Sequence, residues 1–414
     1  MHPLLIYRAV LWLTAPLLLG YTAWRAARDG GMVYLRHRLG LDAPALREPL
    51  WIHCASVGEV NAILPLLLAL GRRHPKTPLL VTTITTTGRD ALIRPAGIEV
   101  THHFLPLDFT HCVKRFMQSV RPRCAIMVET ELWPNLYEHC ASANIPLIMV
   151  NARLSARTLN APAPIRGAYH HVLTGVASIL ARSDADAERF KRLGALPARV
   201  ETLGNIKFAR PHTHEPQAPP DLIGCPYWLA ASTHDDEELR LARVWRRLRG
   251  NGEVLVIAPR HPERRVAILR QLRSLGTNIA VRSRGDSVDS TTRVYLVDTL
   301  GELTALMAHA RLVFMGGSLV PVGGHNLLEP ARLGRPVLVG PHMHNFAFET
   351  RSLLAAEAIM MARDDRELAF ALERLLTDKE LRDALGRRAA AFMEARADIA
   401  QVYLERLEAL CGLN

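Results

Sequence analysis

SLVPVGGHNLLEPARLGRPVLVGP, residues 318 to 341, places a pair of glycines and a polar cluster between two apolar segments. Gly323 and Gly324 would let backbone N–H groups approach a phosphate closely, and a helix that begins near Asn326 would add its positive end. Glu329, in the first turn of that helix, has the carboxylate needed to accept hydrogen bonds from ribose hydroxyls. The segment predicts a nucleotide site, although ordinary turn glycines and a first-turn acid favoured by the helix dipole explain its spacing equally well.

The rest of the chain alternates short apolar strands with helix-length amphipathic segments, a pattern typical of parallel sheets covered on both faces. We expect strands in two series, at 50–53, 79–83, 125–128, 145–150 and 175–181, and then at 227–231, 254–258, 279–282, 294–296, 312–315 and 337–339. Residues 205–221 carry four prolines and no periodicity, which indicates an interdomain linker. The sequence thus predicts an α/β protein of two Rossmann-like domains, with ligands in a cleft at the carboxyl ends of both sheets.

The N-terminal segment 4–24, LLIYRAVLWLTAPLLLGYTAW, is apolar apart from Arg8 and is followed by a basic segment, 25–38. About 20 apolar residues suffice to cross a bilayer, and the basic flank would then lie in the cytoplasm. Arg8 and Pro16 favour the alternative of a helix that lies in the membrane interface. In either case we expect the folded body to be held at a membrane, on its cytoplasmic side.

The composition limits the partners and argues against some classes of site. The 414 residues carry a formal net charge of +11, which favours polyanionic partners such as phosphorylated substrates or an anionic membrane surface. The basic residues are spread along the chain without a nucleic-acid-binding motif, so we expect no nucleic-acid partner. The six cysteines form no CxxC pair and the 18 histidines show no metal-ligand spacing, so we expect reduced thiols and no metal site.

Charged residues at strand ends are the candidates for catalysis in the first half. Glu59 opens a helix within SVGEV, where a carboxylate on the cleft side is placed to act as a general base. Glu129 and Glu131 end a strand within VETELWPN, and we expect them to point the same way. Segments 151–155 and 204–208, NARLS and GNIKF, add cations that can bind phosphate or carboxylate. Taken one by one, these residues are also explained as a first-turn glutamate and solvated loop charges.

Ten ordered segments together resemble one family. They run from the N-terminal segment to about residue 341 and read SVGE, TTITTTG, LPLD, ETELWPN, NARLS, GNIKF, STH, PRHPER, LGEL and GGSLVPVGGHNLLEP. Through them the chain resembles the 3-deoxy-D-manno-octulosonic acid (Kdo) transferases of lipopolysaccharide synthesis. It departs from the family pattern at Leu327, where a proline is usual, and at Ala209, where an acid is common.

The resemblance implies the GT-B glycosyltransferase fold, a Kdo donor activated by cytidine monophosphate (CMP) and a tetraacylated lipid A precursor, lipid IVA, as acceptor. It also implies an inverting transfer in lipopolysaccharide core biosynthesis at the bacterial inner membrane, without a metal or other cofactor. By the same resemblance Glu59 is the general base, and Glu129 and Lys207 stabilise the transition state. CMP-Kdo has a single phosphate, so Arg260, Lys207 and a helix N-terminus would suffice to neutralise it without a cation.

The resemblance also places the donor in the second half of the chain. The implied CMP-binding residues are Pro259, Arg260, Leu300, Gly301, Glu302, Asn326, Leu327, Leu328 and Glu329, and further candidates for substrate contact are Ser232, Ser318 and Gly324. We expect five parts, namely an anchor at 1–25, an acceptor domain at 26–208, a linker at 209–221, a donor domain at 222–395 and a C-terminal helix at 396–414 that packs back on the first domain.

Two other functions remain open on the sequence alone. Another GT-B enzyme, a transferase or epimerase acting on a UDP-sugar, would share the fold and would differ in its donor preference. A membrane-attached glycolipid binder without catalysis would suit the positive charge and the apolar N-terminus. Such a binder would keep its function when Glu59 is replaced by glutamine.

Overall fold

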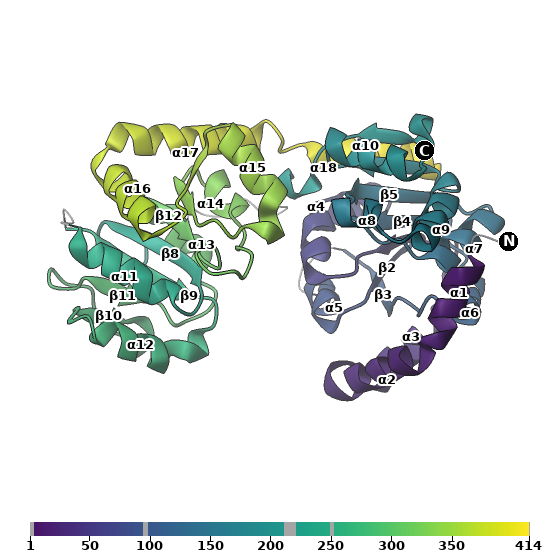
Figure 1. Cartoon of the computed structure of the whole chain (residues 1–414), viewed down its shortest axis with the longest axis horizontal. Helices are drawn as coiled ribbons and strands as arrows, with labels where there is room; N and C mark the ends of the chain where they lie inside the picture. Colours follow the sequence, from purple (N-terminus) through teal and green to yellow (C-terminus); the bar gives the residue numbers. More distant parts are fainter. Residues whose placement is uncertain (1–3, 94–97, 211–220, 249–251, 414) are drawn as a thin grey trace. The chain divides into compact units, whose positions relative to one another are not determined.

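The computed structural model describes residues 4–93, 98–210, 221–248 and 252–413. The chain divides into two compact units, unit 1 with Met1–His212 and Ala397–Asn414, and unit 2 with Thr213–Arg396. Each unit is built on one seven-stranded sheet of parallel strands. Helices join the strands in both units (Figure 1). Most of the linker predicted at 209–221 lies outside the described residues.

The sheet of unit 1 has the order β3-β2-β1-β4-β5-β6-β7, and every neighbouring pair is parallel. Alternate residues enter two separate hydrophobic clusters, with Trp51 in one and Ile52 in the other, so both faces of the sheet are covered. The strands are β1 (Leu50–His53), β2 (Leu79–Thr83), β3 (Thr101–Phe104), β4 (Cys124–Val128), β5 (Leu147–Ala152), β6 (Ser178–Ala181) and β7 (Val200–Thr202).

The helices of unit 1 include the last one of the chain. Tyr403 in this C-terminal helix donates its hydroxyl to the carbonyl of Gly204 at 2.9 Å, and Leu407 enters a core cluster of unit 1. The helices that follow the N-terminal segment are α4 (Val57–Arg73), α5 (Thr86–Ile93), α6 (Thr110–Val120), α7 (Pro134–Ser142), α8 (Ala156–Leu159), α9 (Ala163–Thr174), α10 (Asp184–Leu193), η2 (Pro197–Arg199), η3 (Ile206–Phe208) and α18 (Ile399–Cys411).

Unit 2 repeats the scheme with the order β10-β11-β9-β8-β12-β13-β14. Trp228 and Trp245 meet edge to face in its core, with ring centroids 5.7 Å apart. Its strands are β8 (Tyr227–Thr233), β9 (Val254–Pro259), β10 (Ile279–Val281), β11 (Val294–Leu296), β12 (Val313–Met315), β13 (Val337–Val339) and β14 (Ile359–Met361). Its helices are α11 (Glu237–Arg247), η4 (Pro262–Arg264), α12 (Arg265–Arg273), η5 (Arg282–Arg284), α13 (Leu303–His309), α14 (Leu328–Arg332), η6 (His344–Phe346), α15 (Ala347–Ala355), α16 (Asp365–Thr377) and α17 (Lys379–Glu394).

The apolar N-terminal segment forms two helices, which corrects the prediction of a single anchor helix. The apolar segment divides into α1 (Leu5–Leu13) and α2 (Ala15–Arg25), and the basic segment after it forms the π-helical turn η1 (Ala26–Gly30) and α3 (Gly31–Arg38). The chain bends between α1 and α2 because Thr14 ends the first helix and Pro16, which has no N–H to donate, occupies the first turn of the second. Within the described part of the chain no single helix is long and apolar enough to span a membrane; Leu5–Leu13 and Ala15–Arg38, bent by 58°, meet that criterion only as a pair.

One face of α1 is fixed to unit 1 by polar contacts. Tyr7 donates its hydroxyl to Asp108 at 2.8 Å, and Arg8 donates to the side chain of Asn135 at 2.8 Å. The other face is apolar and exposed: Leu13 at the end of α1 is 82% exposed and Leu17 in α2 is 77% exposed. The charge that interrupts the apolar sequence therefore has a partner in the folded unit.

Three strands, β3, β7 and β14, were not expected from the sequence. They are only three or four residues long and lie at or next to the edges of their sheets. In β3, His102 packs edge to face on Phe104, and His103 stacks on His37 with centroids 3.7 Å apart. Burial lowers the pKa of His102 to about 3 and that of His103 to about 4, so both rings pack as neutral aromatic side chains.

Candidate functional site

The charged residues predicted in the first half gather at one edge of the sheet of unit 1. The strand order reverses between β1 and β4, and Glu59 and Glu129 follow these two strands. Arg153 follows β5, and Lys207 lies in η3 beyond β7. The carboxyl ends of parallel strands at such a reversal form the usual ligand crevice of open α/β sheets.

Glu59 is held by the start of helix α4. Ser56 is the N-cap residue and its hydroxyl oxygen accepts from the backbone N–H of Glu59 at 3.4 Å. The Glu59 carboxylate in turn accepts from the N–H of Ala55 at 2.7 Å and from the Ser56 hydroxyl at 3.1 Å. This arrangement is a form of capping box, and it fixes the carboxylate above the end of β1.

Glu129 is buried between two cations. Its carboxylate contacts Arg153 at 2.6 Å and Lys207 at 3.0 Å, and its side chain is 4% exposed. Its backbone has φ 61°, in the left-handed region that residues other than glycine rarely adopt. The Glu129 side chain reaches Arg153, which follows β5, and Lys207 in η3.

Glu131 has different partners from Glu129, although both acids lie close enough to Glu59 to raise its pKa. β4 ends at Val128, and the two-residue alternation of a strand does not continue into the loop. Glu131 accepts from the Trp133 indole at 2.8 Å and lies 3.6 Å from the buried ring of His53. Burial alone would raise the pKa of Glu131, but the contacts with His53 and Trp133 and the charge of Arg153 outweigh it and lower the pKa.

The three carboxylates are close enough to affect one another. Burial, together with the negative charges of Glu129 and Glu131, raises the pKa of Glu59 to about 7. Hydrogen bonds from Ala55 and Ser56 oppose this shift without cancelling it. Glu59 therefore has the proton affinity of a general base that works near neutral pH, whereas its neighbours are occupied by ion pairs and hydrogen bonds.

The residues predicted in the second half also follow strand ends, here in unit 2. Ser232 lies at a bulge in β8, and Pro259 ends β9. The segment 300–302 follows β11, and the segment 316–329 follows β12. The sheet order reverses between β8 and β12, so unit 2 has a crevice position of the same kind as unit 1.

The glycines of the opening segment serve the backbone of the loop. Gly324 has φ 76°, and an added Cβ there would lie 2.2 Å from the sulfur of Met343. The N–H groups of Gly323 and Gly324 both donate to the carbonyl of Gly317, at 3.1 and 2.8 Å. Ser318 is buried, and its hydroxyl accepts from the N–H of Gly340 at 2.8 Å. The predicted phosphate contacts through these two glycine N–H groups are therefore taken by internal hydrogen bonds in this structure.

A buried glutamate that was not predicted from the sequence accepts hydrogen bonds from a second set of backbone N–H groups in this loop. The carboxylate of Glu237 accepts from the N–H of Gly317 at 2.7 Å, of Ser318 at 3.0 Å and of Leu319 at 2.9 Å. It also accepts from the N–H of His234 at 2.8 Å. Glu237 thus joins the ends of β8 and β12 and shapes the loop. The acid-rich segment after β8 was the only sequence signal for this role.

Three histidines and Arg260 form the basic part of the site. The Nε2 atoms of His234 and His325 are 2.8 Å apart, and the ring of His261 lies edge to face on His234. Burial lowers the pKa of His325 to about 4, as do the repulsion that His234 exerts when protonated and the positive charge of Arg260. Two neutral rings can share a hydrogen bond, one as donor and one as acceptor. The exposed Arg260 forms no ion pair with any described residue, so its guanidinium is available to an anion.

Polar side chains lie at the start of α14 and in the neighbouring segments before and within α13. Asn326 accepts from the N–H of Leu328 at 3.2 Å, and α14 begins at Leu328, two residues later than predicted. Glu329 accepts from the hydroxyl of Thr304 at 2.5 Å, and Glu302 contacts Arg282 at 2.7 Å. Leu327 and Leu328 are buried, so any contact they make with a ligand runs through the backbone; Leu300 and Gly301 lie in the loop before α13.

The chain is similar to known proteins along nearly its whole length. The family described as 3-deoxy-D-manno-octulosonic-acid transferase (kdotransferase) matches residues 34–210. The 3-deoxy-D-manno-octulosonic acid transferase of Bordetella pertussis is 34% identical over 98% of this chain and 99% of its own length. The enzyme of the same name from Haemophilus influenzae is 32% identical over 97% of this chain and 98% of its own length.

The chain belongs to the Kdo transferase family. This membership decides against the non-catalytic alternative and against a UDP-sugar enzyme. The fold of this Kdo transferase is also that of UDP-GlcNAc 2-epimerase from Neisseria meningitidis, with a TM-score of 0.59 at 13% identity over 87% of this chain and 99% of the epimerase. An epimerase-like protein from Listeria monocytogenes gives 0.60 at 14% identity over 89% and 98% of the two chains. These likenesses confirm the predicted GT-B architecture.

The described parts of this Kdo transferase contain no group of three or more His, Cys, Asp or Glu residues arranged to hold a metal ion. The candidate residues Glu59, Glu129 and Lys207 lie together in unit 1, as the sequence predicted. Arg153, the cation expected from the NARLS segment, contacts Glu129 at 2.6 Å. His53, which lies 3.6 Å from Glu131, was not singled out. The signal for His53 is a polar residue at the end of an otherwise apolar strand, LWIH.

Proposed function

We propose that this Kdo transferase moves Kdo from CMP-Kdo to a lipid A precursor, lipid IVA, with inversion at the anomeric carbon. The observation that carries the proposal is Glu59, a carboxylate fixed at the strand reversal of unit 1 whose pKa is raised to about 7. Family membership and the motifs of both units support the choice of donor and acceptor.

In the proposed reaction Glu59 removes the proton from an acceptor hydroxyl. The hydroxyl oxygen forms a bond to the anomeric carbon of Kdo as the bond from that carbon to the CMP phosphate oxygen breaks, and CMP leaves with the electron pair. Lys207 would balance the negative charge that develops on the phosphate, while the Glu129 carboxylate would face the positive charge on the sugar. The ion pair of 3.0 Å between these two side chains fixes both positions.

The donor would bind to unit 2. Arg260 is exposed at the end of β9 and would contact the CMP phosphate, and Glu329 and Asn326 would contact the ribose. The loop is organised before the ligand arrives because Glu237 already holds its backbone N–H groups. Binding of CMP-Kdo would therefore need few changes in the backbone of this loop.

The proposed transfer needs no metal ion, and a reconstituted assay tests it. We expect purified enzyme to transfer Kdo from CMP-Kdo generated in situ to lipid IVA in the presence of EDTA, with the product mass giving the number of Kdo units. Glu59→Gln should lower the rate by about 10²- to 10⁴-fold, the usual contribution of a general base. A wild-type enzyme that is inactive with this pair refutes the proposed substrates, and an active Glu59→Gln variant places the base elsewhere.

We also propose that the protein binds the cytoplasmic face of the bacterial inner membrane through the exposed face of α1 and α2. This face combines Leu13, Leu17 and Trp24, which are 82%, 77% and 51% exposed. Exposed leucines flanked by tryptophan are typical of helices that lie in a membrane interface.

Flotation with anionic vesicles tests the membrane contact. Leu13→Asp combined with Leu17→Asp should leave most of the protein unbound, because each charge would have to enter the apolar part of the interface. Val266→Asp and Phe370→Asp together provide a matched control, since both residues are exposed apolar residues of unit 2. Equal flotation of the two double variants would exclude this face as the membrane contact.

A further inference from the structure

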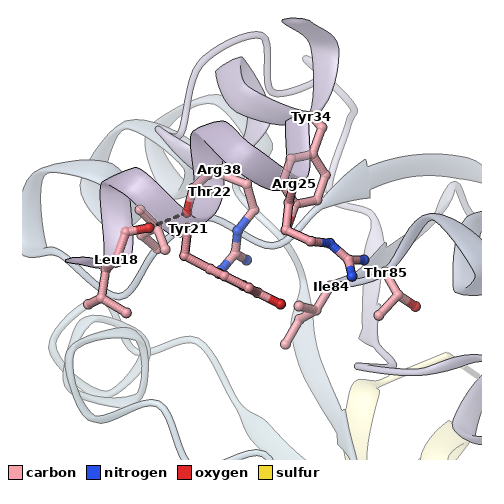
Figure 2. A pocket seen from close by; sticks show the side chains of 9 residues that line it. Leu18, Tyr21, Thr22, Arg25, Tyr34, Arg38, Ile84 and Thr85 are labelled. Atoms are coloured by element: carbon pink, nitrogen blue, oxygen red, sulfur yellow. Dashed lines mark hydrogen bonds between the residues drawn. The ribbon is translucent and has the colours of Figure 1, made fainter. Parts of the chain in front are cut away.

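A cavity lies between the N-terminal helices and the end of strand β2 in unit 1. Figure 2 shows it from close by, with α2 and α3 on one side and the segment after β2 on the other. Its volume is about 160 Å³, several times the roughly 30 Å³ share of one water molecule. Its lining combines cations, hydroxyls and apolar side chains, namely Leu18, Tyr21, Thr22, Arg25, Tyr34, Arg38, Ile84, Thr85 and Leu107.

Arg38 is a buried cation in this lining that has no acidic partner. It is 7% exposed, and one guanidinium nitrogen donates to the carbonyl of Leu105. Its Nε atom is buried without a hydrogen-bond partner, and no carboxylate among the described residues pairs with it. Burial lowers the pKa of Arg38, and the ionisable groups near it are Tyr34, Cys112 and Tyr21. A buried guanidinium without a counter-charge is costly, and an anion in the cavity would offset that cost.

Arg25 and Thr85 add two further donors on the other side of the cavity. Figure 2 shows the Arg25 side chain extending toward Thr85. The only carboxylate near Arg25 in the described structure is Asp29, at 3.8 Å, a weak contact. The Thr85 oxygen accepts from the N–H of Gly88 at 3.1 Å and from the Thr87 hydroxyl at 3.3 Å, so its own proton is not used in these bonds. Two guanidinium groups and a hydroxyl are the donors that phosphate oxygens prefer.

The cavity adjoins the Glu59 site through a short path of hydrogen bonds. The N–H of Ile84, which lines the cavity, donates to the carbonyl of Ala55 at 3.2 Å. The N–H of the same Ala55 donates to the Glu59 carboxylate at 2.7 Å. A ligand that fills the cavity therefore lies next to the residues that position the proposed general base.

The cavity also adjoins the apolar face that we assign to the membrane. Leu18 and Tyr21 in α2 line it, and Leu17 and Trp24 of the same helix are exposed. A ligand that carries a phosphate and acyl chains could place the phosphate against Arg38 and leave the chains beside α2. A free phosphate would gain nothing from this apolar surround.

We propose that this cavity binds a phosphate group of the acceptor glycolipid and thereby holds the acceptor with its reacting hydroxyl near Glu59. The inference rests on the proposed function, because it assumes a phosphorylated amphiphile as acceptor. It assigns Arg25, Arg38 and Thr85 as positioning residues for the acceptor. They do not take part in the chemical step.

Equilibrium binding tests this assignment without requiring transfer. Full-length protein is titrated with lipid IVA in neutral phosphatidylcholine nanodiscs, which suppress non-specific attraction to anionic lipid. Arg25→Gln and Arg38→Gln should each weaken binding about tenfold or more, as expected for loss of a hydrogen bond to a charged group. Arg36→Gln is the matched control: it removes the same charge from α3, but Arg36 pairs with Asp42 on the surface.

A second set of titrations uses lipid IVA lacking one or the other phosphate. Removal of the phosphate that occupies the cavity should weaken binding to wild type and to Arg36→Gln about tenfold, and should cost Arg25→Gln and Arg38→Gln much less. The assignment is overturned if, for each of the two phosphates, its removal costs these two variants as much as it costs wild type. It is also overturned if inorganic phosphate protects the wild type against unfolding more than lipid IVA does, because the site would then be one for the free anion.

Thermal unfolding shows whether each variant is folded. If Arg38→Gln does not fold, Arg25→Gln still tests the assignment, because the Arg25 side chain is partly exposed and its replacement should disturb the fold less. The transfer assay separates the two proposals. If wild type binds lipid IVA through its phosphate but transfers no Kdo to it from CMP-Kdo, the assignment of the cavity is supported and the proposed donor is refuted. If wild type and Arg25→Gln both transfer Kdo with the same KM for lipid IVA, the proposed function is supported and the assignment of the cavity is refuted.

Discussion

At the scale of single residues, the proton affinity of Glu59 depends on its acidic neighbours. The pKa of Glu59 is raised to about 7 by burial and by the charges of Glu129 and Glu131. A general base works only when deprotonated, so we expect kcat/KM to fall about tenfold per pH unit as the pH drops below about 7. Because removal of a nearby negative charge favours deprotonation, Glu131→Gln should move this acid limb to lower pH.

The measurement is the rate of Kdo transfer at saturating donor and limiting lipid IVA, which gives kcat/KM for the acceptor, from about pH 5 to about pH 9, with the limb fitted for each variant. Glu138→Gln is the matched control, because Glu138 in α7 pairs with His171 in α9 and is not among the groups that shift the pKa of Glu59. An acid limb that stays in place in Glu131→Gln while the rate changes would mean that the titrating group is not Glu59.

At the scale of elements, Asp108 connects three parts of unit 1. Its carboxylate accepts from the N–H groups of Asn135 and Leu136, both at 2.9 Å, and so caps helix α7, whose own N-cap residue makes no side-chain cap. It also accepts from the hydroxyl of Tyr7 in α1 at 2.8 Å. The LPLD and ETELWPN segments therefore meet at a helix cap, which gives both a structural purpose beside any catalytic one.

We expect Asp108→Ala to lower the free energy of unfolding by roughly 2–4 kcal/mol, since it leaves two helix N–H groups and a phenol without an acceptor. Tyr7→Phe removes one of these bonds and should cost about 1 kcal/mol, with faster proteolysis near α1. Denaturant unfolding and limited proteolysis measure both effects. Equal stability of Asp108→Ala and Tyr7→Phe would show that the cap on α7 contributes nothing.

At the scale of the whole molecule, unit 1 is assembled from both ends of the chain. Helix α18 supplies Tyr403, Leu404 and Leu407 to a core cluster that also includes side chains from strands β1, β4 and β5. Glu408 in the same helix contacts His74 at 2.7 Å and Arg73 at 2.9 Å at the end of α4. Stability of unit 1 therefore depends on residues that are synthesised after all of unit 2.

We expect Leu407→Ala to destabilise unit 1 by about 2–4 kcal/mol through a cavity in its core, while unit 2 keeps its stability. Hydrogen exchange followed by mass spectrometry measures the two units separately, with lost protection expected in β1, β4 and β5. Val402→Ala in the same helix is the control, because Val402 is 43% exposed. Protection lost equally in both units would contradict the division of the chain at this helix.

Apolar runs and turn residues in the sequence determined most of the strands, both parallel sheets and the helical C-terminus, because burial on both faces of a parallel sheet requires nearly continuous apolar segments. The motifs determined the family and placed Glu59, Glu129 and Lys207 in one site. The sequence did not determine which acid pairs with which base, since Glu129 meets Arg153 and Lys207 only when β4, β5 and η3 come together. Nor did the sequence show that Glu237 accepts hydrogen bonds from the N–H groups beside the glycine loop, or that Arg38 lies buried beside a cavity. These features depend on contacts between residues far apart in the chain, and only the tertiary structure brings such residues within bonding distance.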